Sequence, residues 1–201
     1  MSGTIGGGGA LAQFDLGQTA TFTGFLDFFF VGQNRPTGTL TWSLDDTDVT
    51  ALSITNIAPT GGSVEGRLQV PAQITMRKPG SALLRATYSG DASYEPITYG
   101  PVSVNVRKLN PTMAVTSVLH NSGGTQFSSL TITVTPPSLS LPTGITPPVP
   151  TGIVTVGGFT FNLQPAPDSR SAVATGDIGS VANFTALYPG DSSYNSAQKA
   201  F

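Results

Sequence analysis

The chain has 201 residues, of which 24 are glycine and 16 are proline, and only 10% are charged. This composition disfavours long helices, because glycine and proline cost about 1 and 3 kcal/mol in a helix interior. The net charge of −2 argues against nucleic acid as a partner, and the absence of cysteine excludes disulfides and thiolate metal sites.

The N-terminal segment, residues 1–12, contains four consecutive glycines and predicts a flexible tether or an extended arm. It has neither the basic region nor the apolar region of a secretory signal peptide. Its glycines lack the Gly-Lys-Ser/Thr ending of a phosphate-binding loop. No stretch of the sequence approaches the ~20 apolar residues of a membrane-spanning helix, so we expect no membrane insertion.

Strands are predicted along the rest of the chain by apolar residues at every second position. Turn residues separate these short segments, which is the pattern of a β-sandwich. The sets expected to share a buried face in the first half are Ala20-Phe22-Gly24-Leu26, Leu40-Trp42-Leu44, Ala82-Leu84-Ala86-Tyr88 and Val102-Val104-Val106. In the second half they are Val115-Ser117, Leu130-Ile132-Val134, Val154-Val156 and Phe184-Ala186-Tyr188.

An apolar cluster interrupts the first half, formed by Phe25, Phe28, Phe29, Phe30 and Val31. Alternation with Phe22 directs Phe25 outward, and the other four residues enter a loop, where large apolar side chains must be covered. Either the domain covers them itself, or they form a contact with a partner or a second copy. No basic residues nearby support insertion into lipid.

The next cluster is acidic, with Asp45, Asp46 and Asp48 following the strand that ends at Leu44. The spacing could supply oxygen ligands to calcium, but the glycine and glutamate of an EF-hand loop are missing. We expect a solvated turn in which these side chains bond to the backbone, with calcium as the open alternative.

Two motifs occur twice along the chain, which indicates an internal duplication. Tyr88, Gly90, Asp91 and Tyr94 recur as Tyr188, Gly190, Asp191 and Tyr194. Upstream, Pro36-Thr37-Gly38 recurs as Pro150-Thr151-Gly152, and each leads into a strand. The first copy is longer between its two motifs, and the extra residues are most simply placed at 45–62. In the second copy, residues 136–150 hold six prolines and predict a stiff, extended connection.

These duplicated segments, Ala-Thr-Tyr-Ser-Gly-Asp-Ala-Ser-Tyr at 86–94 and its counterpart at 186–194, resemble the bacterial Ig-like repeat family. The resemblance implies two tandem immunoglobulin-like β-sandwiches, at residues 13–106 and 107–201, with a short linker at 107–111. It further implies that Tyr88 and Tyr188 pack in the cores and that Asp91 and Asp191 shape the loops that follow them. Calcium at these aspartates stays an alternative.

Catalysis is not expected, because nucleophilic triads need a base and the chain holds one histidine. His120 precedes Asn-Ser-Gly-Gly and is expected in a solvated loop. We therefore expect a non-enzymatic structural or binding protein without a cofactor, acting through protein partners. The setting expected first is a bacteriophage virion, as a capsid decoration or tail-associated protein that contacts other virion subunits or its own copies. The alternatives are a spacer or adhesin at the bacterial cell surface and a glycan-binding module.

Overall fold

A computed structural model describes residues 2–6, 13–27, 36–44, 53–56, 67–179 and 184–201. The described part of the chain is all-β: 60% of the residues there lie in strands, and none lies in a helix. Accordingly, no helix in that part of the chain is long and apolar enough to cross a membrane. Two compact units divide the chain, unit 1 at Met1–Arg107 and unit 2 at Lys108–Phe201.

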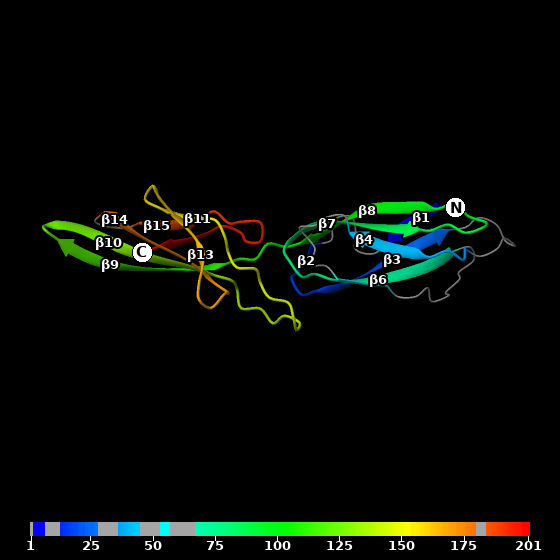
Figure 1. Ribbon diagram of the computed structural model, residues 1–201, viewed down its shortest axis with the longest axis horizontal. Helices are drawn as coiled ribbons and strands as arrows, with labels where there is room; N and C mark the ends of the chain where they lie inside the picture. The colour runs from blue at the N-terminus through cyan, green and yellow to red at the C-terminus, as the bar shows by residue number, and fades with distance from the viewer. Residues whose placement is uncertain (1, 7–12, 28–35, 45–52, 57–66, 180–183) are drawn as a thin grey trace. The chain divides into compact units, whose positions relative to one another are not determined.

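Unit 1 contains two four-stranded sheets (Figure 1). The first has the order β1-β3-β6-β5 and consists of β1 (Ser2–Gly6), β3 (Thr19–Asp27), β6 (Arg67–Thr75) and β5 (Ser53–Asn56). The second has the order β2-β8-β7-β4 and consists of β2 (Gln13–Phe14), β8 (Ile97–Val106), β7 (Gly80–Tyr88) and β4 (Leu40–Leu44).

The core of unit 1 lies between these two sheets. Phe22 and Ile74 from the first sheet pack in one cluster with Trp42, Leu84 and Val104 from the second. The approach is close, because a Cβ on Gly24 would lie 2.8 Å from Leu40 Cδ2 in the other sheet. Burial of each large apolar side chain stabilises the fold by about 1.5–3 kcal/mol. The alternation expected from the sequence is thus observed, and it produces a sandwich-like pair of sheets.

The first part of the N-terminal segment is extended and paired with a neighbouring strand, so it is not a flexible tether. Residues 2–6 form β1, which pairs antiparallel with β3 from Ser2 opposite Asp27 to Gly6 opposite Thr23. A short strand needs no apolar pattern of its own when its backbone completes the ladder of a neighbour. The remaining part of the expected arm, residues 7–12, lies outside the described residues.

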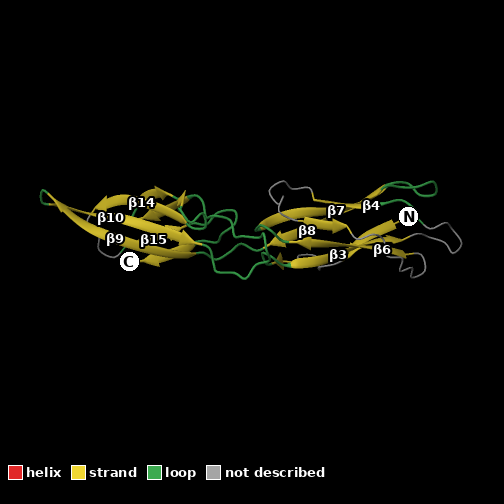
Figure 2. Cartoon of the chain, turned by 60° about the horizontal axis from the view of Figure 1, so that its bottom comes forward, coloured by secondary structure: helices red, strands yellow, loops and turns green. Residues whose placement is uncertain are grey.

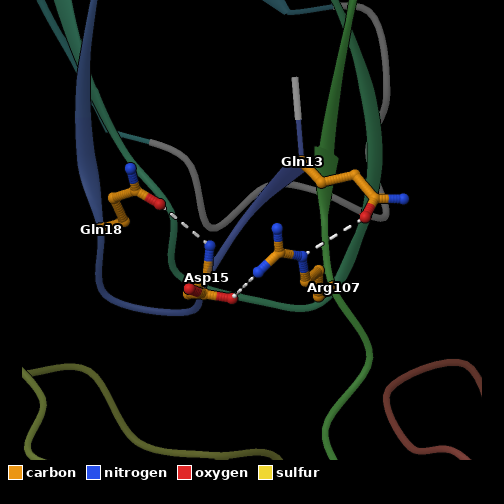
Figure 3. A network of polar contacts seen from close by, with 4 residues as sticks. All are labelled: Gln13, Asp15, Gln18 and Arg107. Carbon is orange, nitrogen blue, oxygen red and sulfur yellow. Dashed lines mark hydrogen bonds and ion pairs between the residues drawn. The ribbon is translucent and has the colours of Figure 1, made fainter. Parts of the chain in front are cut away.

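Residues at the end of unit 1 hold β2 against β8 (Figure 3). Arg107 donates from Nε to Gln13 Oε1 at 3.3 Å and forms an ion pair with Asp15 through Nη1 at 3.0 Å. The Asp15 backbone amide donates to Gln18 Oε1 at 3.1 Å. The Arg107 amide also donates to the Phe14 carbonyl. The first residue of the segment expected as a linker is therefore bonded to unit 1.

Unit 2 again contains two four-stranded sheets (Figure 2). The first has the order β13-β14-β10-β9 and consists of β13 (Gln164–Pro165), β14 (Ala172–Gly179), β10 (Thr125–Thr135) and β9 (Thr112–Ser122). The second has the order β12-β11-β15-β16 and consists of β12 (Phe159–Asn162), β11 (Ile153–Val156), β15 (Thr185–Tyr188) and β16 (Ala197–Ala200).

The core of unit 2 follows the predicted alternation in its central strands. Leu130, Ile132 and Val134 of β10 are buried, as are Val154 and Val156 of β11. The two sheets approach each other closely where Gly176 of β14 faces the ring of Phe161 from β12. A Cβ on Gly176 would lie 2.6 Å from Phe161 Cδ1. Only glycine fits this position without displacing the ring.

Leu109, also expected in the linker, belongs to unit 2. Its amide donates to the Ser193 carbonyl at 2.9 Å, and its own carbonyl accepts from the Asn195 amide at 2.8 Å. The Leu109 side chain is buried. Residues near the unit boundary are thus fixed by backbone hydrogen bonds to their own units.

Candidate functional site

The repeated Tyr-Gly-Asp motif of unit 1 organises a network around the Asp91 carboxylate, in the turn that follows β7. Its Oδ1 accepts hydrogen bonds from the amides of Ser93 and Tyr94 at 2.8 and 2.9 Å. Its Oδ2 accepts from the Tyr88 hydroxyl and from the Thr37 amide, both at 2.6 Å. We call this network the unit 1 brace, because it joins the turn after β7 to the segment before β4.

Two glycines make this geometry possible. Gly90 has a φ of +76°, a conformation that residues with a side chain rarely adopt. Gly38 has its amide 3.1 Å from the Tyr88 hydroxyl, which accepts its hydrogen bond. A Cβ on Gly38 would lie 2.7 Å from the Tyr88 ring and would also collide with the Gly90 carbonyl. The glycine of Pro-Thr-Gly is therefore needed for the close approach to the Tyr-Gly-Asp turn.

Unit 2 repeats the arrangement around Asp191. The amides of Ser193 and Tyr194 donate to Oδ1 at 2.7 and 2.9 Å. Thr151 donates to Oδ2 from both its amide and its hydroxyl, each at 2.9 Å. We call this network the unit 2 brace. The duplicated sequence motifs thus produce the same contacts of the carboxylate with the threonine and with the two turn amides in both units.

The tyrosines of the two braces are bonded differently. Tyr88 and Tyr188 are both fully buried, but only the Tyr88 hydroxyl donates to its aspartate. The Tyr188 hydroxyl has no hydrogen-bond partner among the described residues, although burial raises its pKa and Asp191 lies near enough to raise it further. Tyr194 is fully buried and donates to the Pro148 carbonyl in the proline-rich connection. That connection is thus anchored to the unit 2 brace.

Hydrogen bonding to the braces lowers the pKa of both aspartates. The Tyr88 hydroxyl is the largest cause for Asp91, followed by the Thr37 amide, and the pKa falls well below its usual range. For Asp191, burial raises the pKa, but the donors on Ser193 and Thr151 together outweigh it, so the net pKa is lowered. Burial, and then the neighbouring carboxylate, raise the pKa of Tyr88 and Tyr188.

These carboxylates are committed to structure. Each one accepts hydrogen bonds at both oxygens from groups of its own unit, which leaves little capacity for a cation or for proton transfer. In the described parts of the chain, no three His, Cys, Asp or Glu side chains gather in a way that could hold a metal ion.

A third aspartate closes a different turn. Asp168 Oδ1 accepts from the amides of Arg170 and Ser171 at 2.9 and 3.0 Å, and these bonds lower its pKa. Ser169, which lies between Asp168 and Arg170 in the sequence, has a φ of +53°. This turn and the proline-rich connection line an open hollow in unit 2. Asp168 is fully engaged within its own turn, so it acts there as a structural residue.

The apolar cluster expected as a partner contact is only partly within the described residues. Phe25 lies in β3, half-buried, on the face opposite the buried Phe22 and Leu26. This outward orientation is the one that the alternation predicts. Phe28, Phe29, Phe30 and Val31 lie outside the described residues, as do Asp45, Asp46 and Asp48 of the expected acidic turn.

The predicted loop position of His120 is wrong. His120 lies in β9 rather than in a loop, and its ring stacks on Phe127 of β10 at a centroid distance of 4.9 Å. The turn expected to include it is shorter, because Gly123 and Gly124 alone connect the two strands. Two glycines are enough to reverse the chain in a tight hairpin.

Thr37 and Thr151 are the brace residues that sequence reasoning missed. Each follows the proline of Pro-Thr-Gly and donates to the aspartate of the second motif. The duplication of both motifs in the same order indicated a repeated unit, but it did not indicate that the two motifs contact each other.

No protein-family model matches the chain, and no curated protein matches it.

Proposed function

We propose that the chain is a non-enzymatic structural protein of two immunoglobulin-like domains that acts through protein–protein contacts. The strand orders support the fold assignment. In unit 2, β9, β10, β14 and β13 follow the A, B, E and D order of an immunoglobulin sheet, while β11, β15 and β16 follow C, F and G. In unit 1, β3, β6 and β5 correspond to B, E and D, and β4, β7 and β8 to C, F and G.

One observation carries the structural role: the aspartate of the duplicated Tyr-Gly-Asp motif is used in both units to join two neighbouring strands of one sheet. Asp91 and Asp191 would be the natural candidates for chemistry, because each follows a strand end and faces several donors. Instead, both are held by the turn and by a threonine from a distant segment. A protein that repeats the same bracing network in both units is suited to bearing load or presenting surfaces.

The setting we propose is a bacteriophage virion, with a spacer or adhesin at the bacterial surface as the alternative. This proposal rests on the resemblance of the duplicated segments to bacterial Ig-like repeats. Quantitative mass spectrometry of purified particles tests it. We expect the chain in a fixed ratio to a capsid or tail subunit. Its absence from particles, together with its presence in a cell-surface fraction, would favour the alternative and overturn the virion setting.

A second experiment tests the partner contact expected at the apolar cluster. Replacing Phe28, Phe29 and Phe30 by serine should abolish incorporation into the assembly while the melting temperature of the isolated chain is retained. A lowered melting temperature instead would assign these side chains to the protein's own core. Serine substitutions at exposed Thr41 and Thr87 of unit 1 serve as controls for expression and handling.

A further inference from the structure

The long edge strand of unit 2, β9, has one side unpaired. Its eleven residues pair with β10 without interruption, from Thr112 opposite Thr135 to Ser122 opposite Thr125. β9 is the last strand of its sheet, and it pairs with no second strand among the described residues. An unpaired edge presents a row of backbone donors and acceptors to another chain.

The hairpin turn determines which backbone groups point outward. Gly123 and Gly124 have φ values of +58° and +83°, as in the two-residue type I′ turn that closes on a hydrogen-bonded pair. Bonded and non-bonded pairs then alternate along the ladder. The residues of β9 whose amide and carbonyl groups face away from β10 are therefore Met113, Val115, Ser117, Leu119 and Asn121.

This edge lacks the features that normally prevent strand addition. Residues 112–135 contain no Asp, Glu, Lys, Arg or Pro, and the pairing of β9 with β10 has no bulge. Charged side chains, prolines and bulges are the usual protection of an edge. Two apolar side chains on β9 are also strongly exposed, Val118 at 59% and Leu119 at 61%. Because they are consecutive, they lie on opposite faces of the strand.

We propose that β9 pairs antiparallel with β9 of a second copy, across a two-fold axis at Ser117. The five outward residues are symmetric about Ser117, so this register alone uses all of them. It places Val115 opposite Leu119 of the second copy and Met113 opposite Asn121 of the second copy. About ten backbone hydrogen bonds form in this ladder.

A second copy suits the edge because of its charge and shape. Identical strands meet no like charges in this register, since β9 contains no carboxylate, lysine or arginine. The central residue, Ser117, is small and exposed. On one face Leu119 contacts Val115 of the second copy, and on the other face Val118 contacts Thr116 of the second copy. The two-fold pairing of β9 with β9 of a second copy thus covers both Val118 and Leu119.

Cysteine cross-linking of the full chain tests the register, because the protein has no cysteine of its own. In the two-fold pair the Cα atoms of the two copies of residue 117 lie about 5.5 Å apart, within the usual range for a disulfide. The two copies of residue 121 are eight residues apart along the ladder, about 27 Å. We expect Ser117→Cys to form a disulfide dimer at least about tenfold more than Asn121→Cys under mild oxidation.

A mixture adds a positive control for the register. Met113→Cys and Asn121→Cys should each stay monomeric alone and should cross-link to each other when combined. Equal cross-linking of all variants would indicate random collision and would overturn the proposal. The absence of any dimer with Ser117→Cys would overturn it as well.

Association without covalent capture is measured by sedimentation velocity over a range of concentrations. Ser117→Lys places two like charges at the axis and should raise the dimer dissociation constant at least about tenfold. Thr160→Lys, the matched control, adds the same charge at an exposed site on edge strand β12 of the other sheet and should leave it unchanged. Both positions are exposed, so the melting temperature should not change at concentrations where the wild-type chain is monomeric. A wild-type chain that is monomeric throughout would overturn the proposal.

The inference deepens the proposed function, because it names a surface and a partner for the protein–protein contacts. The virion setting and the β9 pairing can be overturned separately. A dimer through β9 in a chain that is absent from particles would remove the virion setting alone, whereas a monomer found in particles would remove the β9 pairing alone.

Discussion

The Oδ2 atom of Asp91 lies 2.6 Å from the backbone nitrogen of Thr37, although 54 residues separate the two in the chain. Asp191 and Thr151 make the corresponding contact at 2.9 Å in unit 2. In both units this bond connects the turn after one strand to the start of another strand of the same sheet. The aspartate of each turn therefore contacts a segment that is far away in the sequence.

Loss of a brace should destabilise its unit. Asp191→Ala removes the acceptor of the Ser193, Tyr194 and Thr151 donors and leaves part-buried amides without a partner. We expect unfolding of unit 2 to become easier by about 1–3 kcal/mol. Urea denaturation followed by far-ultraviolet circular dichroism measures this change. Ser192→Ala, at an exposed neighbouring position, is the control, and an equal effect of both variants would contradict a special role for the carboxylate.

The two buried tyrosines should respond differently to the loss of the hydroxyl. Tyr88→Phe removes hydrogen bonds to Asp91 and Gly38 and should cost about 1 kcal/mol. Tyr188→Phe removes a buried hydroxyl without a partner among the described residues and should be neutral or slightly stabilising. Thermal unfolding of both variants measures the difference. Equal losses would mean that the Tyr188 hydroxyl forms a bond in solution.

Glycine at position 38 should be required for close packing of the unit 1 brace. Gly38→Ala forces a Cβ against the Tyr88 ring and should destabilise unit 1 by about 1–3 kcal/mol. Fluorescence of Trp42, the single tryptophan, reports on this unit. Ser43→Ala, at an exposed position of β4 in the same unit, is the control and should leave the stability of unit 1 unchanged. Retained stability of Gly38→Ala would show that the Pro-Thr-Gly segment shifts freely.

Stability should fall in acid through the brace aspartates. The pKa of both Asp91 and Asp191 is lower in the folded state, so the folded protein favours their charged form. Their contribution is fully present above the unfolded-state pKa of about 3.9 and is lost as the pH falls further, through the folded-state values. Melting temperatures measured from pH 6 to pH 2 test this. The melting temperature of the double variant Asp91→Asn with Asp191→Asn should fall less between pH 6 and pH 2 than that of the wild type. An equal fall in both proteins would contradict a role of these aspartates in the acid dependence.

The sequence predicted the central strands well because their side chains alternate between a core and solvent. Leu130, Ile132 and Val134 are buried together, as the two-residue period requires. The duplication of Tyr-Gly-Asp likewise predicted a turn after β7 and a matching turn after β15. Such patterns are visible because packing selects the residue type at every second position.

Other features had no side-chain signal. The strand β1 forms through backbone pairing with β3, so its Ser-Gly-Thr-Ile-Gly sequence resembles a flexible arm. His120 precedes residues with turn propensity, but the reversal needs only Gly123 and Gly124, and the strand continues past the histidine. The contact between Asp91 and Thr37 depends on which segments the fold brings together, and no local preference predicts that.

The brace has a consequence for how such domains can vary. Its threonine and aspartate are 54 residues apart in unit 1 and 40 apart in unit 2, yet the same threonine-to-aspartate bond forms in both units. Lengthening a flexible connection adds little entropic cost, about 0.6 kcal/mol per doubling. Insertions between the threonine and the aspartate should therefore cost little stability. This architecture can acquire new loops, and with them new binding specificities, while the threonine-to-aspartate bond is kept.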